Sequence, residues 1–357
     1  MYSEKVSVTL STVSSLLYAA KKYLVSGLVS ECLKVLDKSV TVDTVCEVLE
    51  QCVLFGEEEL KKKVLSFIYF TAAVLFSTEG FMHLTRDTLE IVAGLEPLAC
   101  TERYLFESCL KWARHQLLES GNESPRDEEV REVLGSVLYK IRFPAMTSKE
   151  FAELTAHSQI LTGDEKHDVY VYLATKEKLE SLTFMTSNRC LRNVSIIKRF
   201  MECSSMRDCG NVVHAIDIQA TVGLWLTGVG LYGGEQGSTH DVALGVLKGQ
   251  EKLSKTARTI TSDGSKTPII FGLARPVYII ANNRYTVLVA MKGPKTWSGD
   301  RGMVLCNLSG QGNYIAFHDT MCTSHPSRIN SSSTNSGQIP ELFCVSRSAG
   351  PTTGVPH

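Results

Sequence analysis

The chain contains 357 residues, of which 43% are hydrophobic and 21% are charged, a composition typical of a soluble globular protein long enough for two domains. No apolar run approaches the ~20 residues that cross a bilayer, and the N-terminus lacks a basic segment followed by an apolar one. These features argue against a membrane span and a secretory signal, and they predict a cytoplasmic protein.

Charge and glycine content divide the chain in two. Residues 1–185 carry 20 Lys and Arg against 28 Asp and Glu, a net charge of −8, whereas the remainder carries +7. Glycine follows the same division, with 7 before position 186 and 19 after it. Glycine-poor sequence favours helices, and glycine-rich alternating sequence favours strands and turns. The basic residues of the second half are scattered singly, which favours solvated strand faces over a nucleic-acid surface.

Cysteine and histidine spacing indicates neither disulfides nor a metal site. In a reducing compartment the eleven cysteines are expected to be free thiols. They form no C-x-x-C pair, and the nine histidines form no H-x3-H or H-E-x-x-H pattern. We therefore predict no metal ligands and no cofactor.

The first half has the pattern of short amphipathic helices. Thr12 is the expected N-cap of a helix whose apolar residues recur at i, i+3 and i+4: Val13, Leu16, Leu17, Ala20, Tyr23 and Leu24. Further helices are expected over residues 28–36 and from Asp43. The brief loops between them predict antiparallel neighbours.

Charge order and capping residues mark the later helices. Glu57–Glu59 followed by Lys61–Lys63 complements the helix macrodipole and favours i, i+4 ion pairs on a solvated face. Capping residues are expected to begin three more helices: Thr101, Thr147 with Glu150, and Thr162 with Glu165. About eight helices are predicted over residues 11–175, with no catalytic motif among them.

The glycine-rich half alternates apolar and polar residues, the period of strands. Breaks at Gly, Asn and Pro recur about every 10 residues without a helical pattern between them, which predicts an antiparallel β-sandwich. Ser331–Ser336 is expected to be a flexible loop before the final strand, where a ligand could be held. The alternating positions include Leu224, Leu226, Val242, Leu244, Val246, Val277, Ile279, Tyr285, Val287 and Val289.

Catalytic patterns are weak in this half. Gly228-x-Gly-x-x-Gly233 matches a nucleotide-binding pattern, but Gly234–Thr239 is too rich in glycine to begin the helix that would hold a phosphate. We interpret the glycines as a tight turn between strands, and Ser262–Ser265 as another turn. Three histidines each stand alone in the sequence: His214, His240 and His318. The protein is therefore not expected to be an enzyme.

Specific segments of the helical half resemble a known family. The run Leu16–Tyr23 followed by the helix over 28–36 resembles the last two helices of a BTB (POZ) domain, and Asp43–Phe70 resembles the helix pair that continues into a BACK domain. Other segments resemble the BACK domain of BTB-BACK-PHR proteins: Ser77–Phe81, Asp87–Val92, Trp112-Ala113 and Arg142–Thr147.

The second half resembles the PHR domain, the β-sandwich at the C-terminus of these proteins. The similar segments are Gly228–Gly233, Ser262–Ser265, Pro276-Val277 and Ser336–Leu342. On this resemblance the front of the BTB domain is missing before Leu16, and a homodimer is expected only with a complete BTB domain. The resemblance implies BTB helices over 1–40, a BACK domain over 41–178, a linker over 179–194, a PHR domain over 195–347 and a disordered tail over 348–357.

The resemblance implies an adaptor of a ubiquitin ligase, with the BTB and BACK helices binding cullin-3 and the PHR domain holding the target. Tyr23 is the first candidate cullin contact, because the aromatic residue that ends the A-A-x-x-Y helix is a contact position in the family. Equally, Tyr23 could continue the buried apolar stripe. Leu24 and the helix pair with Val45, Val48 and Leu49 are supporting candidates. The alternative function is a cullin-independent scaffold or cytoskeletal interaction protein.

Overall fold

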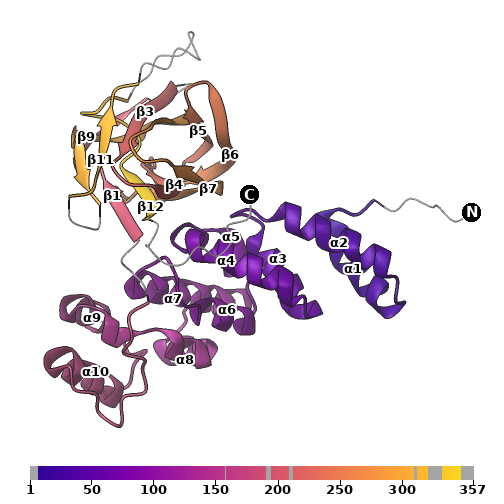
Figure 1. The fold of residues 1–357 in the computed structure, drawn as a ribbon. Helices are drawn as coiled ribbons and strands as arrows, with labels where there is room; N and C mark the ends of the chain where they lie inside the picture. Colours follow the sequence, from indigo (N-terminus) through magenta and orange to yellow (C-terminus); the bar gives the residue numbers. More distant parts are fainter. Residues whose placement is uncertain are drawn as a thin grey trace, which may run out of the picture. The chain divides into compact units, whose positions relative to one another are not determined.

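The computed structural model describes residues 7–156, 158–189, 194–208, 212–308, 312–320 and 332–346. The chain divides into two compact units, Met1–Arg189 and Cys190–His357, and each is described by itself. The expected fold class is confirmed: a helical array comes first, and an antiparallel β-sandwich follows it (Figure 1).

Short helices make up the first unit. Successive helices pack on one another, as α1 does on α2, α3 on α4 and α7 on α8. The described helices are α1 (Leu10–Lys22), α2 (Ser26–Ser39), α3 (Val45–Phe55), α4 (Glu58–Leu75), α5 (Glu79–Met82), α6 (Arg86–Ala93), α7 (Glu102–Glu119), α8 (Asp127–Leu134), α9 (Ser148–Thr155) and α10 (Gly163–Thr175), with 3-10 turns at Gly135–Lys140 and Phe143–Ala145.

Threonine side chains cap several of these helices. The hydroxyl of Thr101 accepts a hydrogen bond from the Tyr104 N–H at 3.2 Å, and both expected capping boxes, at α9 and α10, are confirmed. The expectation for α1 was wrong. Its N-cap is Thr9, and Thr12 is the third helical residue, whose hydroxyl accepts the Thr9 N–H at 3.0 Å. The Thr9-x-x-Thr12 pair closes a reciprocal cap one turn before the position expected for the helix start.

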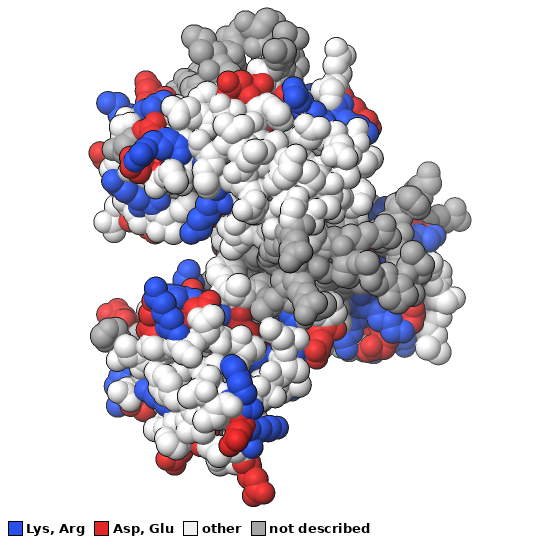
Figure 2. Space-filling view, turned by 60° about the vertical axis from the view of Figure 1, so that its left-hand side comes forward, with Lys and Arg blue, Asp and Glu red and all other residues white. Residues whose placement is uncertain are grey.

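Ion pairs cover the outer side of α4. The expected pairing occurs at i, i+3 instead of i, i+4: Glu58 contacts Lys61 at 3.3 Å and Glu59 contacts Lys62 at 2.8 Å. Glu57 instead pairs with Lys21 of α1 at 2.6 Å. In Figure 2, acidic and basic side chains likewise lie beside one another in most places where charged residues are seen.

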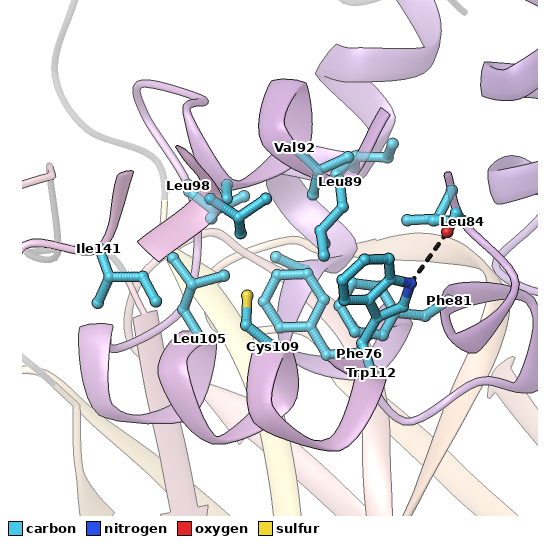
Figure 3. Packing of buried hydrophobic residues seen from close by; sticks show 14 of the residues in the cluster. Phe76, Phe81, Leu84, Leu89, Val92, Leu98, Leu105, Cys109, Trp112 and Ile141 are labelled. Atoms are coloured by element: carbon cyan, nitrogen blue, oxygen red, sulfur yellow. Dashed lines mark hydrogen bonds between the residues drawn. The ribbon is translucent and has the colours of Figure 1, made fainter. Parts of the chain in front are cut away.

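One part of the core of the helical unit lies where α4, α6 and α7 meet the turn after α5. Aromatic and aliphatic side chains interdigitate there (Figure 3). Trp112 of α7 is almost fully buried, and its indole N–H donates to the Leu84 carbonyl at 2.9 Å. The bond satisfies the single polar atom of a large apolar side chain. The turn after α5 is therefore tied to α7.

The segment that leaves the helical unit docks back onto it. Residues 179–189 fall in the predicted linker, yet Leu182 and Phe184 are buried in the helical core. Arg189 is buried as well, and its Nε donates to the Glu102 carboxylate at 2.7 Å. Its guanidinium also donates to the carbonyl of Leu95 at 3.0 Å. The unit thus continues in structure up to Arg189.

The second unit is built from antiparallel sheets. A four-stranded sheet has the order β1-β12-β4-β7, a six-stranded sheet has the order β10-β11-β3-β8-β5-β6, and β2 pairs with β9. The strands are β1 (Val194–Lys198), β2 (Phe200–Arg207), β3 (Val212–Ala220), β4 (Leu224–Leu231), β5 (Thr239–Lys248), β6 (Glu251–Thr261), β7 (Ile269–Ile279), β8 (Arg284–Lys292), β9 (Thr296–Gly302), β10 (Leu305–Asn307), β11 (Tyr314–His318) and β12 (Glu341–Ser346).

The glycine pattern of this unit belongs to a strand and not to the turn that the sequence suggested. Gly228 and Gly230 lie inside β4, which has a bulge between Leu226 and Gly228. A Cβ at Gly230 would stand 2.9 Å from the Glu341 Cβ, so glycine permits the close approach of β12. No helix follows β4 among the described residues, and the strand that comes next is β5.

The serine segment before β12 is anchored, contrary to the expectation of a flexible loop. Ser332 is buried, and its hydroxyl lies 3.0 Å from His214 Nδ1 and accepts the Gln338 N–H at 3.2 Å. Gln338 in turn donates to the Thr296 hydroxyl at 2.6 Å and accepts the Tyr232 N–H at 2.7 Å. Polar side chains thus join the ends of several strands, and Ser331 lies outside the described residues.

Candidate interaction surfaces

Tyr23 and Leu24 stand out from the helical unit at the turn between α1 and α2. The Tyr23 side chain is 71% exposed and Leu24 is 88% exposed. Tyr23 is the C-cap of α1, and Leu24 adopts the left-handed backbone conformation, with φ 57°. The interpretation of Tyr23 as part of the buried stripe is therefore wrong, because the stripe ends at Ala20.

The three supporting candidates lie beneath the surface. Val45, Val48 and Leu49 are each 0% exposed in the core of the helical unit. Their side chains have no surface to offer a partner in this structure. They fix the position of α3, whose last turn carries the exposed Leu54.

A groove beside α1 was not visible from the sequence. It has a volume of about 690 Å³ and is lined by Ser11, Ser14, Ser15, Tyr18, Leu54 and Phe55. Tyr18 is 60% exposed and Leu54 is 69% exposed. The Lys21 ammonium donates to the Phe55 carbonyl at 2.7 Å and holds α1 against the end of α3. Apolar residues at i, i+3 and i+4 spacing indicate the buried face of a helix, so this pattern does not reveal apolar residues on the outer face.

Lys22 connects the groove to the exposed turn. Its Nζ lies 5.9 Å from the centre of the Tyr18 ring and 5.8 Å from that of Tyr23, within the range of cation–π attraction. We define the α1 surface as Tyr18, Tyr23, Leu24 and Leu54. Large exposed apolar side chains that gather in this way mark protein contacts more often than single exposed residues do.

The sandwich unit has a shallow groove on its six-stranded sheet. Ala257 of β6, Ala243 of β5 and Ala290 of β8 are paired in register across the three strands. Their small side chains form the floor of a groove of about 430 Å³, and its rim carries Asp241 and Lys292. Large side chains in the same row would fill the groove, so the alanines create it.

A buried arginine occupies the interior of the sandwich. Arg199 is 0% exposed, and no described residue hydrogen-bonds its three guanidinium nitrogens. The guanidinium lies 4.2 Å from the centre of the Phe200 ring and 5.7 Å from that of Phe317, so aromatic faces take the place of hydrogen-bond acceptors. Burial lowers the pKa of Arg199 to about 9.

The histidines of the sandwich lie in buried surroundings that suit a structural role. Burial, and secondarily the charge of Arg199, lowers the pKa of His214 to about 4. His240 is 0% exposed, its Nε2 lies 3.2 Å from the Pro294 carbonyl oxygen, and burial also lowers its pKa. Both rings are therefore neutral near pH 7. His318 Nε2 is buried without a hydrogen-bond partner among the described residues.

The cysteines of the described segments are free thiols. Burial raises the pKa of the Cys46 and Cys344 thiols to about 12. A high thiol pKa leaves little of the reactive thiolate at neutral pH. No helix within the described ranges is long and apolar enough to pass through a bilayer.

Comparisons with known proteins identify both units. The helical unit matches the BACK family (BTB And C-terminal Kelch) over residues 45–156, and the sandwich matches the PHR domain over residues 198–344. Both are adaptor-type domains and not enzyme families. BACK segments act in protein–protein contacts, so this pair of domains defines an adaptor-type protein.

Relatives named as BTB/POZ domain-containing proteins extend the match to nearly the whole chain. BTB/POZ domain-containing protein 6-B of Danio rerio is 31% identical over 350 residues, which cover 96% of this chain and 70% of the relative. Protein 6 of Homo sapiens is 31% identical over 352 residues, and protein 3 of Mus musculus is 30% identical over 354; the matches cover 63% and 64% of those relatives. The chain belongs to the BTB-BACK-PHR family of BTB/POZ domain-containing proteins.

Proposed function

We propose that the protein is a substrate-recognition adaptor of a cullin-3 RING ubiquitin ligase, in which the helical unit meets cullin-3 and the PHR domain holds the target. The observation that carries the proposal is the α1 surface of Tyr18, Tyr23, Leu24 and Leu54, which leaves four large apolar side chains exposed on one edge of the helical unit.

The chemistry of the α1 surface suits a protein partner. Tyrosine is among the residues most enriched at binding hot spots, because its ring buries much area while its hydroxyl keeps a hydrogen-bonding group. The groove between Tyr18 and Leu54 could receive an apolar side chain of the partner. Lys22 between the two tyrosine rings adds a positive charge that selects for acidic residues opposite it.

The alanine groove is the candidate target surface. It lies on a rigid sheet and combines an apolar floor with a charged rim, as ligand-binding surfaces commonly do. The Thr259 hydroxyl donates to Asp241 at 2.8 Å and orients that carboxylate at the edge of the groove. An extended target segment that presents small apolar side chains fits this shape.

Binding of the cullin-3 N-terminal domain to the purified full chain tests the first half of the proposal. We expect Tyr23→Ala to weaken binding by about 2 kcal/mol, roughly thirtyfold, and Leu54→Ala to weaken it as well. Leu118→Ala, which alters an exposed leucine at the far end of α7, is the matched control and should bind like wild type. Unchanged affinity of a folded Tyr23→Ala variant would remove Tyr23 from the contact.

The target is tested by quantitative pull-down with the full chain. Ala243→Arg fills the floor of the alanine groove, whereas Ala281→Arg places the same side chain on the turn between β7 and β8. Proteins lost with Ala243→Arg but retained with Ala281→Arg are targets of the groove, and equal recovery with both variants contradicts the assignment. A target retained by a wild-type chain that does not bind cullin-3 supports the scaffold function instead.

A further inference from the structure

Two histidines and a glutamate from separate parts of the helical unit meet where α5 contacts α7. His83 directly follows α5, and His115 and Glu119 lie one turn apart near the end of α7. One ligand-type atom from each of the three lies within 4.8 Å of the other two. The separation of 32 residues between the histidines hides this cluster from a search for paired spacing. The spacing His115-x3-Glu119 is the only part of the cluster that the sequence reveals.

The three groups face one another without being hydrogen-bonded. Glu119 directs one oxygen toward His83 Nδ1 at 3.9 Å and the other toward His115 Nδ1 at 3.8 Å. Both separations exceed the range of an N–H···O hydrogen bond. His115 Nδ1 is buried and has no hydrogen-bond partner among the described residues. A buried ring nitrogen without a partner is costly unless another group satisfies it.

The spacing is close to that of ligands around one metal ion. Zinc bonds of about 2.0–2.2 Å in tetrahedral geometry place the ligand atoms roughly 3.3–3.6 Å apart. The separations of 3.8 and 3.9 Å, which involve different oxygens of Glu119, are slightly longer, and the three ligand atoms lie within 4.8 Å of one another. The side chains must therefore move closer together to share one ion. The imidazole rings are nearly perpendicular, with an interplanar angle of 81° and centroids 5.4 Å apart, so the rings do not block each other.

The backbone around His83 is fixed to α7. The Gln116 side chain donates to the Met82 carbonyl at 2.7 Å, and Trp112 donates to the Leu84 carbonyl at 2.9 Å. These bonds hold the residues on either side of His83, and Figure 3 shows the second of them within the packed core. Metal sites gain precision when their ligands sit on such rigid elements. The backbone at His83 is therefore held at a fixed position on α7, which carries His115, before any ion arrives.

A second carboxylate, that of the exposed Glu79, lies near the cluster. Glu79 lies 4.0 Å from His83 Nε2, the ring nitrogen opposite the one that faces Glu119. Histidines that bind metal through one nitrogen usually donate the other N–H to a carboxylate, which sets the tautomer. The ordinary interpretation of the cluster is a solvated group of side chains, since His83 and Glu119 are each about half exposed. The buried Nδ1 of His115 and the fixed backbone favour a ligand.

We propose that His83, His115 and Glu119 bind a zinc-like divalent transition metal, which clamps α5 to the end of α7. Two imidazoles and one carboxylate suit zinc and its neighbours, whereas calcium and magnesium prefer oxygen ligands alone. Three protein ligands leave a fourth position open for water or for a side chain of a partner.

Competition for Zn²⁺ between the full chain and a chromophoric chelator, under a non-chelating reductant, tests the proposal. Ligand loss in His83→Ala or Glu119→Gln is expected to weaken the site by at least about a hundredfold, and loss of the supporting carboxylate in Glu79→Gln by about tenfold. His167→Ala, which removes an exposed histidine of α10, is the matched control and keeps wild-type affinity. Circular dichroism verifies the fold of each variant.

Cysteine thiols compete with the cluster for the metal ion, and the visible spectrum of bound Co²⁺ distinguishes thiolate ligands from nitrogen and oxygen ligands. Nitrogen and oxygen ligation gives visible d–d bands without a thiolate charge-transfer band, and the bands disappear in His115→Ala. Zn²⁺ should also raise the unfolding temperature of the wild type but not of His115→Ala, because only the native state offers the assembled site. Equal Zn²⁺ affinity in all variants, or a cobalt spectrum dominated by thiolate, overturns the proposal.

Discussion

Replacing Arg189 by methionine tests whether the segment after α10 is part of the helical unit. Arg189 and Glu102 are 1% and 2% exposed, and the Nε donates to the carboxylate at 2.7 Å. The guanidinium also donates to the carbonyls of Ala93, Leu95 and Lys140. Methionine has a similar length and no hydrogen-bond donor, so it leaves the carboxylate buried without its partner.

The expected cost is large because the charge that remains cannot reach water. Removing one partner of a buried ion pair typically destabilises a protein by about 3–5 kcal/mol. Glu102 keeps one bond, since its other oxygen accepts the Arg142 N–H at 2.9 Å, which places the expected loss for Arg189→Met at about 3 kcal/mol. The double variant Arg189→Met with Glu102→Gln should lose less than the two single losses added together.

Urea unfolding followed by the helical signal at 222 nm measures the loss in the helical unit. Arg103→Met is the matched control: Arg103 also contacts two carboxylates, at 2.9 and 2.6 Å, but it is 36% exposed, and exposed pairs contribute only about 0–1 kcal/mol. A loss below about 1 kcal/mol for Arg189→Met would refute the docking of residues 179–189. Faster proteolysis in this segment should accompany the expected loss.

Two further predictions concern capping and pH. Thr147→Ala removes the hydroxyl that accepts the Glu150 N–H at 3.2 Å, and it should lower the free energy of unfolding by about 1 kcal/mol in the same urea assay. Thr147→Ser keeps the cap and should retain this stability. Equal stability of both variants would argue against the capping box. The pKa of His214 is lowered from 6.5 to about 4 in the folded state, so the unfolded chain binds the proton first on acidification. The free energy of unfolding therefore decreases as pH falls from about 6.5 to about 4, by up to about 3 kcal/mol. His214→Gln should lack this part of the pH dependence. Parallel stability–pH curves for the wild type and the variant would contradict the prediction.

Local signals in the sequence were enough to predict the individual helices and strands. The capping boxes at Thr147 and Thr162 depend on residues three positions apart, and the alternation of Val242, Leu244 and Val246 depends on the two-residue period of a strand. Neither needs knowledge of the partner element. The position of Thr12 was misjudged because two threonines could cap the same helix and only the backbone selects between them.

Surface and interior were harder to assign. Val45, Val48 and Leu49 have the same apolar chemistry as Leu24 and Leu54, yet the former are buried and the latter exposed. Within α3 the difference arises from which face of the helix packs on its neighbours, a long-range property, whereas Leu24 is exposed because it lies in the turn between α1 and α2. The glycines of β4 were assigned to a turn because the approach of Glu341 from β12 lies more than a hundred residues away.

The sequence by itself determined the family, the order of the helical and β-sandwich units, and most of the elements within them. Periodicity, caps and short motifs depend only on residues that are close together in the chain. Only the tertiary structure placed Tyr18 and Leu54 along one groove, set Ala243 between Ala257 and Ala290, and brought His83 to His115 and Glu119. Each of these sites joins residues from different helices or strands, and the distance between them is decided by packing.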